Sequence, residues 1–340
     1  MLTFEMRRPS VSVLTPTHQR ARYLHRVWQA LAVQVCKDFE WIVADDGSTD
    51  GTEAIVRSLA EQSDFPVVFI RADVHIGKIH MDNEAIAAAR GDFIIWCDSD
   101  DYFVPHTIQR LLDCWGSIPA EQRHSYVGVT ALCTTNTGIL TNPFSDGQSR
   151  DVSWNDLAEV HHVTADMLFF ACADALKKHP FPEVDLVIPE SVVWSAIGHQ
   201  QSRFIPEVLQ VKEYQYDAGL SFSGRMAYNR GRAHALAATV RNFRNYPRSW
   251  RVRTWRLVTF IRYCTHGELS ILEAFRLWRG NSGALAFWLA VPAGKLLAAA
   301  DALQGKVDKT HREFLSAKDK VEIRLERLNE VRFEHESVDR

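Results

Sequence analysis

The first hundred residues alternate short apolar runs with segments of helical spacing. Four apolar runs have the length of buried strands: residues 11–14, 41–44, 67–70 and 93–96. After the first run, four large apolar residues recur at the spacing of one helix face, namely Leu24, Val27, Trp28 and Leu31. Further helices are predicted after residue 50 and over residues 82–90. Strands alternating with helices predict an α/β fold with a doubly wound, mostly parallel sheet.

Polar side chains lie at the ends of three of these runs. Thr15 and Asp46 follow the first two, and Asp98 and Asp100 follow the fourth. Because the carboxyl ends of parallel strands meet at one edge of a sheet, we expect these side chains to converge there. Carboxylate oxygens are the ligands that Mg²⁺ and Mn²⁺ prefer. A metal site is therefore one interpretation of the two aspartates, and a polar turn before the next helix is the other.

Composition narrows the class of protein. The 340 residues are 46% hydrophobic and 24% charged, as expected of a globular chain with a large domain and an extension. The six cysteines form no Cys-x-x-Cys pair, which predicts a reducing compartment and neither a zinc site nor a disulfide framework. Residues 1–10 show no secretory signal, so we expect a cytoplasmic protein. Glycine-rich dinucleotide and P-loop patterns are absent from the sequence.

Three motifs in order resemble those of family 2 glycosyltransferases. They are Val-Leu-Thr-Pro-Thr at 13–17, Asp-Asp-Gly-Ser-Thr-Asp-Gly-Thr at 45–52 and the run from Ala89 through Trp96 to Asp101. The resemblance implies the GT-A fold, an inverting reaction and a nucleotide-sugar donor, expected to be linked to UDP. It also implies a divalent cation, Mg²⁺ or Mn²⁺.

The same resemblance assigns roles to individual residues. Thr15 and Pro16 would line the pocket for the nucleotide base, and Asp46 would contact the uracil or ribose. Asp98 would lie near the ribose and the metal, and Asp100 would ligate the metal. Asp101 is expected to support the turn. Lys78 lies in a Gly-Lys stretch similar to one in the family and would meet a donor phosphate.

A proton acceptor is expected from the later stretch 181–194, which resembles the family's Pro-Glu segment before a helix. We predict that Glu190 is the catalytic base, with Asp185 as the second candidate. Many relatives carry an aspartate where this chain has Ser191. The alternative is that Glu190 only stabilises a helix N-terminus. Two other functions stay open: an inactive nucleotide-sugar-binding or scaffold protein, and a nucleotidyltransferase.

Residues 1–224 are predicted to form the catalytic domain, and the composition changes after them. The segment 225–280 holds twelve arginines against two glutamates. Together with its tryptophans, this predicts a helical region, 225–305, that contacts an anionic membrane. Helices packed on the catalytic domain are the alternative, and nucleic-acid binding is not expected. We expect Pro292 to break the apolar run that starts at Ala284, leaving it shorter than the ~20 residues of a span.

The charged tail, residues 306–340, carries apolar residues at seven-residue intervals and is predicted to be one amphipathic helix. Such a helix would suit a short coiled coil, and hence self-association through the C-terminal helices.

Taken together, the sequence predicts a metal-dependent, inverting glycosyltransferase. It would move a sugar onto a lipid-linked or cell-surface polysaccharide acceptor at the inner face of the cell membrane.

Overall fold

A computed structural model describes residues 8–135, 137–139, 141–163, 166–184, 188–213, 229–243, 249–304 and 321–329. Its strands are β1 Val11–Thr17, β2 Phe39–Asp46, β3 Val67–Ala72, β4 Phe93–Trp96, β5 Tyr102–Phe103, β6 Tyr126–Thr135, β7 Gly138–Ile139, β8 Arg150–Ser153, β9 Leu168–Cys172, β10 Gln201–Val211 and β11 Ile323–Arg327. Its α-helices are α1 Ala21–Ala32, α2 Thr52–Gln62, α3 Lys78–Ala88, α4 Thr107–Gly116, α5 Trp154–Glu159, α6 Ala173–Lys178, α7 Ser191–Ile197, α8 Asn229–Asn242, α9 Trp250–His266, α10 Ile271–Trp278 and α11 Ala284–Leu303.

The strands form one mixed sheet in the order β11-β3-β2-β1-β4-β9-β6-β10-β5. Strands β3, β2, β1 and β4 are parallel to one another, as the alternating pattern predicts. Neighbouring residues of β1 point to opposite faces, so Val13 joins the apolar core on one face and Leu14 the core on the other. Both faces are buried under helices, which explains why the predicted strands are continuous apolar runs. The helix expected over 82–90 begins earlier, at Lys78.

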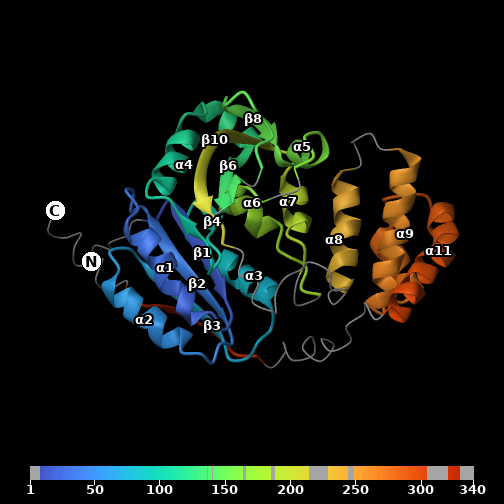
Figure 1. Cartoon of the computed structure of the whole chain (residues 1–340), viewed down its shortest axis with the longest axis horizontal. Helices are drawn as coiled ribbons and strands as arrows, with labels where there is room; N and C mark the ends of the chain where they lie inside the picture. The colour runs from blue at the N-terminus through green and yellow to red at the C-terminus, as the bar shows by residue number, and fades with distance from the viewer. Residues whose placement is uncertain are drawn as a thin grey trace, which may run out of the picture.

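The C-terminal helices stand beside the sheet domain rather than on the sheet (Figure 1). Helices α8, α9, α10 and α11 pack through a core of their own that includes Phe260, Phe287 and Trp278. Helix α8 packs against α7, and its Ala235 belongs to the apolar core of the sheet domain. Polar contacts between described residues add to this packing: the amide of Asn242 donates to the hydroxyl of Ser195 at 2.9 Å, and Arg256 lies 3.5 Å from Glu159. The expected domain boundary near residue 224 falls outside the described residues.

The predicted break at Pro292 is wrong, because α11 runs through this proline from Ala284 to Leu303. A proline removes one backbone bond from a helix, and Pro292 lies on the exposed side, where water can bind the freed carbonyl. Among the described residues, α11 is the one helix whose length and composition would suit a membrane span: 20 residues, mean hydropathy 1.4, 28% buried.

The predicted helix in the tail is also wrong for residues 323–327, which form β11. This strand pairs antiparallel with β3 and covers an edge of the sheet that would otherwise expose its hydrogen-bonding groups. Val321, Ile323 and Leu325 alternate with charged residues, and this strand period competes with the seven-residue helical spacing. The pairing ends at the buried Asn329, whose side chain bonds the backbone at Val67.

Candidate active site

The carboxyl ends of β1, β2 and β4 lie side by side, as expected. Thr15 on β1 is fully buried, and its hydroxyl donates to the carbonyl of Cys97 at 2.8 Å. The same hydroxyl accepts the indole N–H of Trp41 at 3.0 Å. Pro16 is buried as well. The Thr15 hydroxyl therefore ties the strands together, and its burial argues against the predicted contact with a nucleotide base.

Asp46, at the end of β2, organises the loop that follows β3. Its carboxylate accepts the backbone N–H groups of Ile76 at 2.6 Å and Gly77 at 2.8 Å. The same carboxylate lies 2.8 Å from Nδ1 of His75. The ring of His18 stacks on that of His75 with centroids 4.1 Å apart. Asp46 thus fixes a small platform of two stacked imidazoles at the edge of the sheet.

The platform is also the one group of three metal-ligating side chains that lie close together in the described part of the chain. The ligand atoms of His18, Asp46 and His75 all lie within 4.8 Å of one another. Hydrogen bonds account for this proximity, because Nδ1 of His18 lies 2.6 Å from the Asp46 carbonyl and Nδ1 of His75 bonds the carboxylate. The predicted metal residues, Asp98 and Asp100, are not part of it.

The aspartates after β4 are held by cationic side chains. The carboxylate of Asp98 lies 3.8 Å from Nζ of Lys78 and 3.7 Å from Nζ of Lys212. Burial would raise the pKa of Asp98, but the two lysines and Arg20 outweigh it and hold the pKa below its usual range. The carboxylate of Asp100 accepts a hydrogen bond from Arg20 at 2.6 Å. Asp98 therefore stays ionised at a position one third exposed.

Asp101 turns away from the open edge. Its carboxylate lies 2.9 Å from Nζ of Lys212 and accepts the backbone N–H of Glu213 at 3.3 Å. Burial raises the pKa of Asp101 to about 7, against the opposing effect of Lys212. These bonds connect the turn to the end of β10, which is the supporting position that we expect for Asp101.

Lys78 links this turn to Glu190. Its ammonium lies 3.1 Å from Asp82 and 3.1 Å from Glu190. Burial would lower the pKa of Lys78, but Asp82, Glu190 and Asp98 together raise it well above its usual value. Glu190 stands just before α7 and accepts the indole N–H of Trp194 at 3.3 Å. Lys78 and Glu190 lie 112 positions apart in the sequence, yet their side chains are in direct contact.

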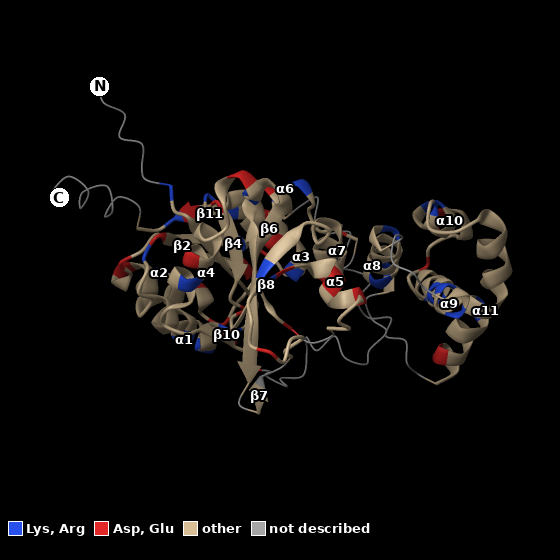
Figure 2. Cartoon of the chain, turned by 90° about the horizontal axis from the view of Figure 1, so that it is seen from above, with Lys and Arg blue, Asp and Glu red and all other residues tan. Residues whose placement is uncertain are grey.

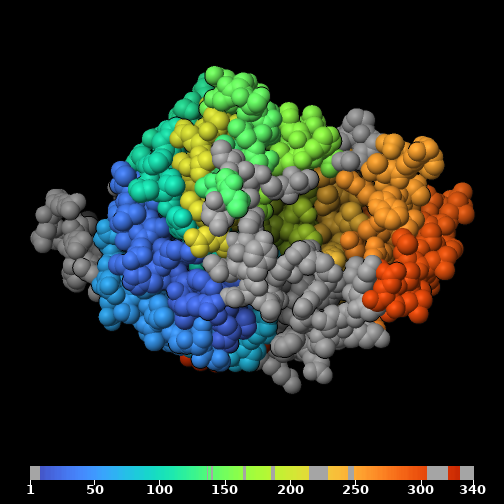
Figure 3. Space-filling model, viewed as in Figure 1, coloured from blue at the N-terminus to red at the C-terminus, as the bar shows by residue number. Residues whose placement is uncertain are grey.

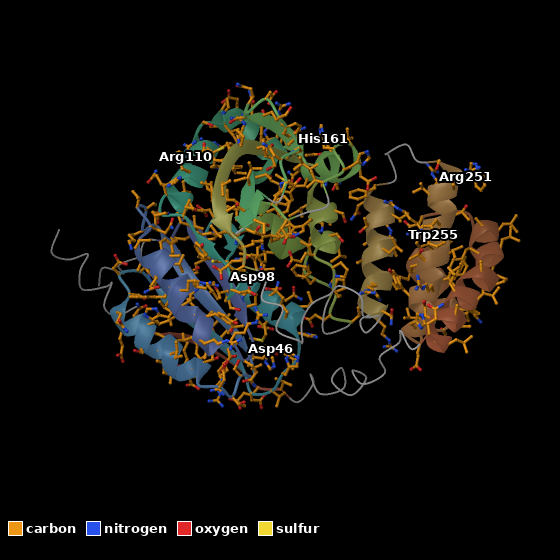
Figure 4. The ribbon with its side chains drawn as sticks, in the orientation of Figure 1. Asp46, Asp98, Arg110, His161, Arg251 and Trp255 are labelled. Carbon is orange, nitrogen blue, oxygen red and sulfur yellow. The ribbon has the colours of Figure 1, made fainter. Side chains whose placement is uncertain are left out.

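A cavity of about 470 Å³ opens at this meeting point. Asp98 and Lys212 line it from the sheet, and Glu190 and Trp194 line it from α7 and the residue before it. Figure 4 shows Asp98 near the centre of the sheet domain and Asp46 at the lower end of the same edge. Asp185, the second candidate for the base, lies outside the described residues.

Sequence reasoning missed several residues of this site. Arg20 and Lys212 hold the aspartates, and Asp82 shares Lys78 with Glu190. Arg20 follows β1 and Lys212 follows β10, so both stand just past strand ends. That position was a usable signal for each of them. Asp82 lies inside α3 with a 1% exposed side chain, and no local pattern marks it as functional.

Several known proteins are similar to this chain. Residues 12–134 match the model of the family described as "Glycosyl transferase family 2". A Campylobacter jejuni GalNAc(5)-diNAcBac-PP-undecaprenol beta-1,3-glucosyltransferase is 30% identical over 104 residues, 31% of this chain and 34% of that protein. Chondroitin synthase of Pasteurella multocida is 32% identical over 157 residues, 46% of this chain and 15% of that protein. The chain thus matches at most about a third of the length of these relatives.

Solved structures show the same fold. S. aureus TarS 1-349 in complex with UDP-GlcNAc superposes with a TM-score of 0.54 at 18% identity, covering 91% of this chain and 86% of that one. The sheet domain is therefore an α/β domain of the GT-A fold. Residues 12–134 are similar to family 2 of the glycosyltransferases.

The bond between His75 and Asp46 predicts a pH dependence. This hydrogen bond raises the pKa of His75, with burial opposing it. A raised pKa in the folded state stabilises the fold below the ordinary histidine pKa of about 6.5, and this contribution is lost as the pH rises through the folded value. Urea unfolding should show His75→Gln destabilising the protein more at acidic pH than at about pH 9.

His124→Gln makes the same replacement at an exposed position and is the matched control. If the difference in the free energy of unfolding between wild type and His75→Gln stays constant with pH, a charged His75–Asp46 pair is excluded.

Proposed function

We propose that this protein is an inverting, divalent-metal-dependent glycosyltransferase. It takes a sugar from a nucleoside diphosphate donor, a UDP-sugar, and transfers it to a hydroxyl of a lipid-linked or cell-surface polysaccharide acceptor. One observation carries the proposal: Lys78 holds Glu190 within 3.1 Å while it lies 3.8 Å from Asp98. Asp98, which is assigned to the donor, and Glu190, which is assigned to the acceptor, line one cavity.

The reaction uses these residues as follows. Glu190 takes the proton of the acceptor hydroxyl as its oxygen bonds to the anomeric carbon of the donor. The bond from that carbon to the diphosphate breaks on the opposite face, and the diphosphate leaves with the electron pair. The products are an inverted glycoside, a nucleoside diphosphate and a proton on Glu190. Lys78 lies between Asp98 on the donor side and Glu190 on the acceptor side. Its ammonium can therefore release Glu190 and bind a phosphate oxygen of the donor instead.

The charges at this edge fit a divalent metal. Among the described residues, Arg20, Lys78 and Lys212 face six carboxylates there: Asp82, Asp98, Asp100, Asp101, Asp166 and Glu190. Burial raises the pKa of Asp82 to about 6 and that of Asp101 to about 7, so protons neutralise part of this excess. No surplus of positive charge remains for a diphosphate. Asp100 and Asp98 supply the oxygen ligands that suit Mg²⁺ or Mn²⁺, and a bound metal would stabilise the departing diphosphate.

Relatives support the donor and acceptor classes. TarS, which shares the fold, has been solved with UDP-GlcNAc. The Campylobacter relative is named for an undecaprenol-linked substrate, and the Pasteurella relative is named a chondroitin synthase. These names support a role in polysaccharide biosynthesis for the cell envelope.

We extend the proposal to a cytoplasmic protein that binds the inner face of the membrane. Arginines crowd α8 and α9, whereas acidic residues lie mostly on the sheet domain (Figure 2). On α11, the side chains of Leu285, Leu289 and Leu296 are 73%, 71% and 71% exposed. Exposed apolar residues near a basic surface favour contact with anionic lipid.

Replacing the proposed base tests the enzyme. Glu190→Gln should lower the rate of sugar transfer about 100-fold or more, because the proton loses its acceptor, while donor affinity changes little. Steady-state kinetics with a UDP-sugar and Mn²⁺, beside a donor titration, measure both effects. Asp185→Asn is the comparison variant and should keep most of the activity. Donor binding with no turnover in the wild type would favour the inactive-protein alternative, and full activity of Glu190→Gln would exclude Glu190 as the base.

Replacing the proposed metal ligand tests the cofactor. Mn²⁺ should raise the affinity for a UDP-sugar in the wild type, and Asp100→Asn should lose most of this gain. Thermal-shift titrations of nucleotide sugars with Mn²⁺ and with a chelator measure it, because a bound ligand raises the unfolding temperature. Asp64→Asn, at an exposed position, is the control. If the wild type binds the UDP-sugar equally tightly with Mn²⁺ and with a chelator, the metal proposal is contradicted.

Replacing exposed leucines tests the membrane contact. The double variant Leu289→Gln and Leu296→Gln should sediment less with anionic vesicles than the wild type, because it buries less apolar surface in the lipid. Leu325→Gln, on β11 in the sheet domain, should behave as wild type. If the double variant sediments as well as the wild type, α11 is not the contact surface.

A further inference from the structure

A second cavity, of about 510 Å³, lies between α8, α9 and the start of α7. Pro189 and Ser191 line it, and the same two residues line the cavity that holds Asp98. Glu190 stands between them in the sequence. The proposed base therefore lies at the boundary of two cavities, and we call the second one the α8/α9 groove.

Two arginines give the α8/α9 groove a positive character. Arg256 on α9 is partly buried, and burial lowers its pKa. Its guanidinium lies 3.5 Å from Glu159. The guanidinium of Arg232 on α8 lies 5.8 Å from the centre of the Tyr263 ring. Two partly buried guanidinium groups favour an anionic ligand, and their planar forks match the oxygens of a phosphate.

The remaining wall of the α8/α9 groove is largely apolar. Leu236 lines it from α8, and Trp255 and Tyr263 line it from α9. Trp255 leaves 60% of its surface exposed, an area that a ligand could remove from water. Figure 4 shows Trp255 on the stretch of α9 that runs beside α8, and in Figure 3 the surface is recessed where the yellow-green segment meets the amber helices. Apolar walls with two cations suit an amphipathic anion.

We propose that the α8/α9 groove binds the acceptor through a lipid diphosphate. Arg232 and Arg256 bind the phosphates, and Leu236 and Trp255 contact the first part of the lipid chain. The sugar attached to the diphosphate then reaches Glu190 across the shared wall. The inference rests on the proposed glycosyl transfer and deepens it, because it selects the lipid-linked acceptor over the free polysaccharide.

Farnesyl diphosphate is a probe that needs no knowledge of the acceptor sugar. Titration calorimetry on the full chain should show it binding at least about tenfold more tightly than farnesol, which lacks the charge, or inorganic diphosphate, which lacks the chain. Equal affinity for farnesol would mean a purely apolar site. Equal affinity for inorganic diphosphate would mean a phosphate site without a lipid. Either result overturns the proposal.

Two pairs of variants locate the binding. Trp255→Ala and Arg256→Gln should each weaken farnesyl diphosphate binding about tenfold. Trp250→Ala and Arg253→Gln replace exposed residues of α9 that do not line the groove and should bind as wild type. Because Trp255 is largely exposed, its variant keeps the test valid even if Arg256→Gln fails to fold. Wild-type affinity in Trp255→Ala, or an equal loss in Trp250→Ala, overturns the assignment.

The same samples separate this inference from the proposed function. UDP-sugar affinity, measured by thermal shift in each variant, should not change, because the donor cavity contains neither Trp255 nor Arg256. Absence of donor binding in the wild type would contradict the proposed function even if farnesyl diphosphate binds. Normal donor binding and turnover without any effect of the groove variants would contradict the groove alone.

Discussion

The site depends on one ammonium group that several carboxylates share. Lys78 lies within 3.1 Å of both Asp82 and Glu190 and 3.8 Å from Asp98. Partly buried carboxylates repel one another, and removing the shared cation would leave each of them without its compensating charge. The lysine is placed by the start of α3, which follows the loop that Asp46 fixes through the backbone of Ile76 and Gly77. The end of β2 therefore determines the geometry around Glu190.

The sequence predicts the parts of this site that are local. Apolar runs locate β1 to β4, because a strand buried on both faces leaves a continuous signal. Polar residues at strand ends locate the edge where Asp46 and Asp98 lie. The pairing of Lys78 with Glu190 has no local signal, since it depends on how α7 packs against the sheet domain. Thr15 also follows a strand, and its hydroxyl bonds the Cys97 carbonyl inside the sheet, a partner that its position in the sequence does not reveal.

The wrong predictions for the C-terminal part have a common cause. Period and residue propensity describe a segment alone, whereas the neighbouring elements decide its structure. The open edge of β3 makes residues 323–327 a strand. Helix α11 continues through Pro292 while it packs closely on α9: Gly294 leaves no room for a side chain against Ile261, and Asp301 bonds His266 at 2.8 Å. A proline costs one helical bond, and packing along the rest of the helix can offset that loss.

The proposed transfer involves two anions, the diphosphate of the donor and the lipid diphosphate of the acceptor. Different residues of the chain would bind each of them. At the edge of the sheet, Arg20, Lys78 and Lys212 face at least as many carboxylates, and we propose that a divalent cation accompanies the donor diphosphate there. In the α8/α9 groove, Arg256 lies 3.5 Å from Glu159, and Arg232 adds a second guanidinium to the lining, so positive charge is already present. A donor that arrives with its metal and an acceptor that meets arginine need not compete for one set of charges. Glu190, next to Pro189 and Ser191 in the wall that both cavities share, is the carboxylate that can serve both sides.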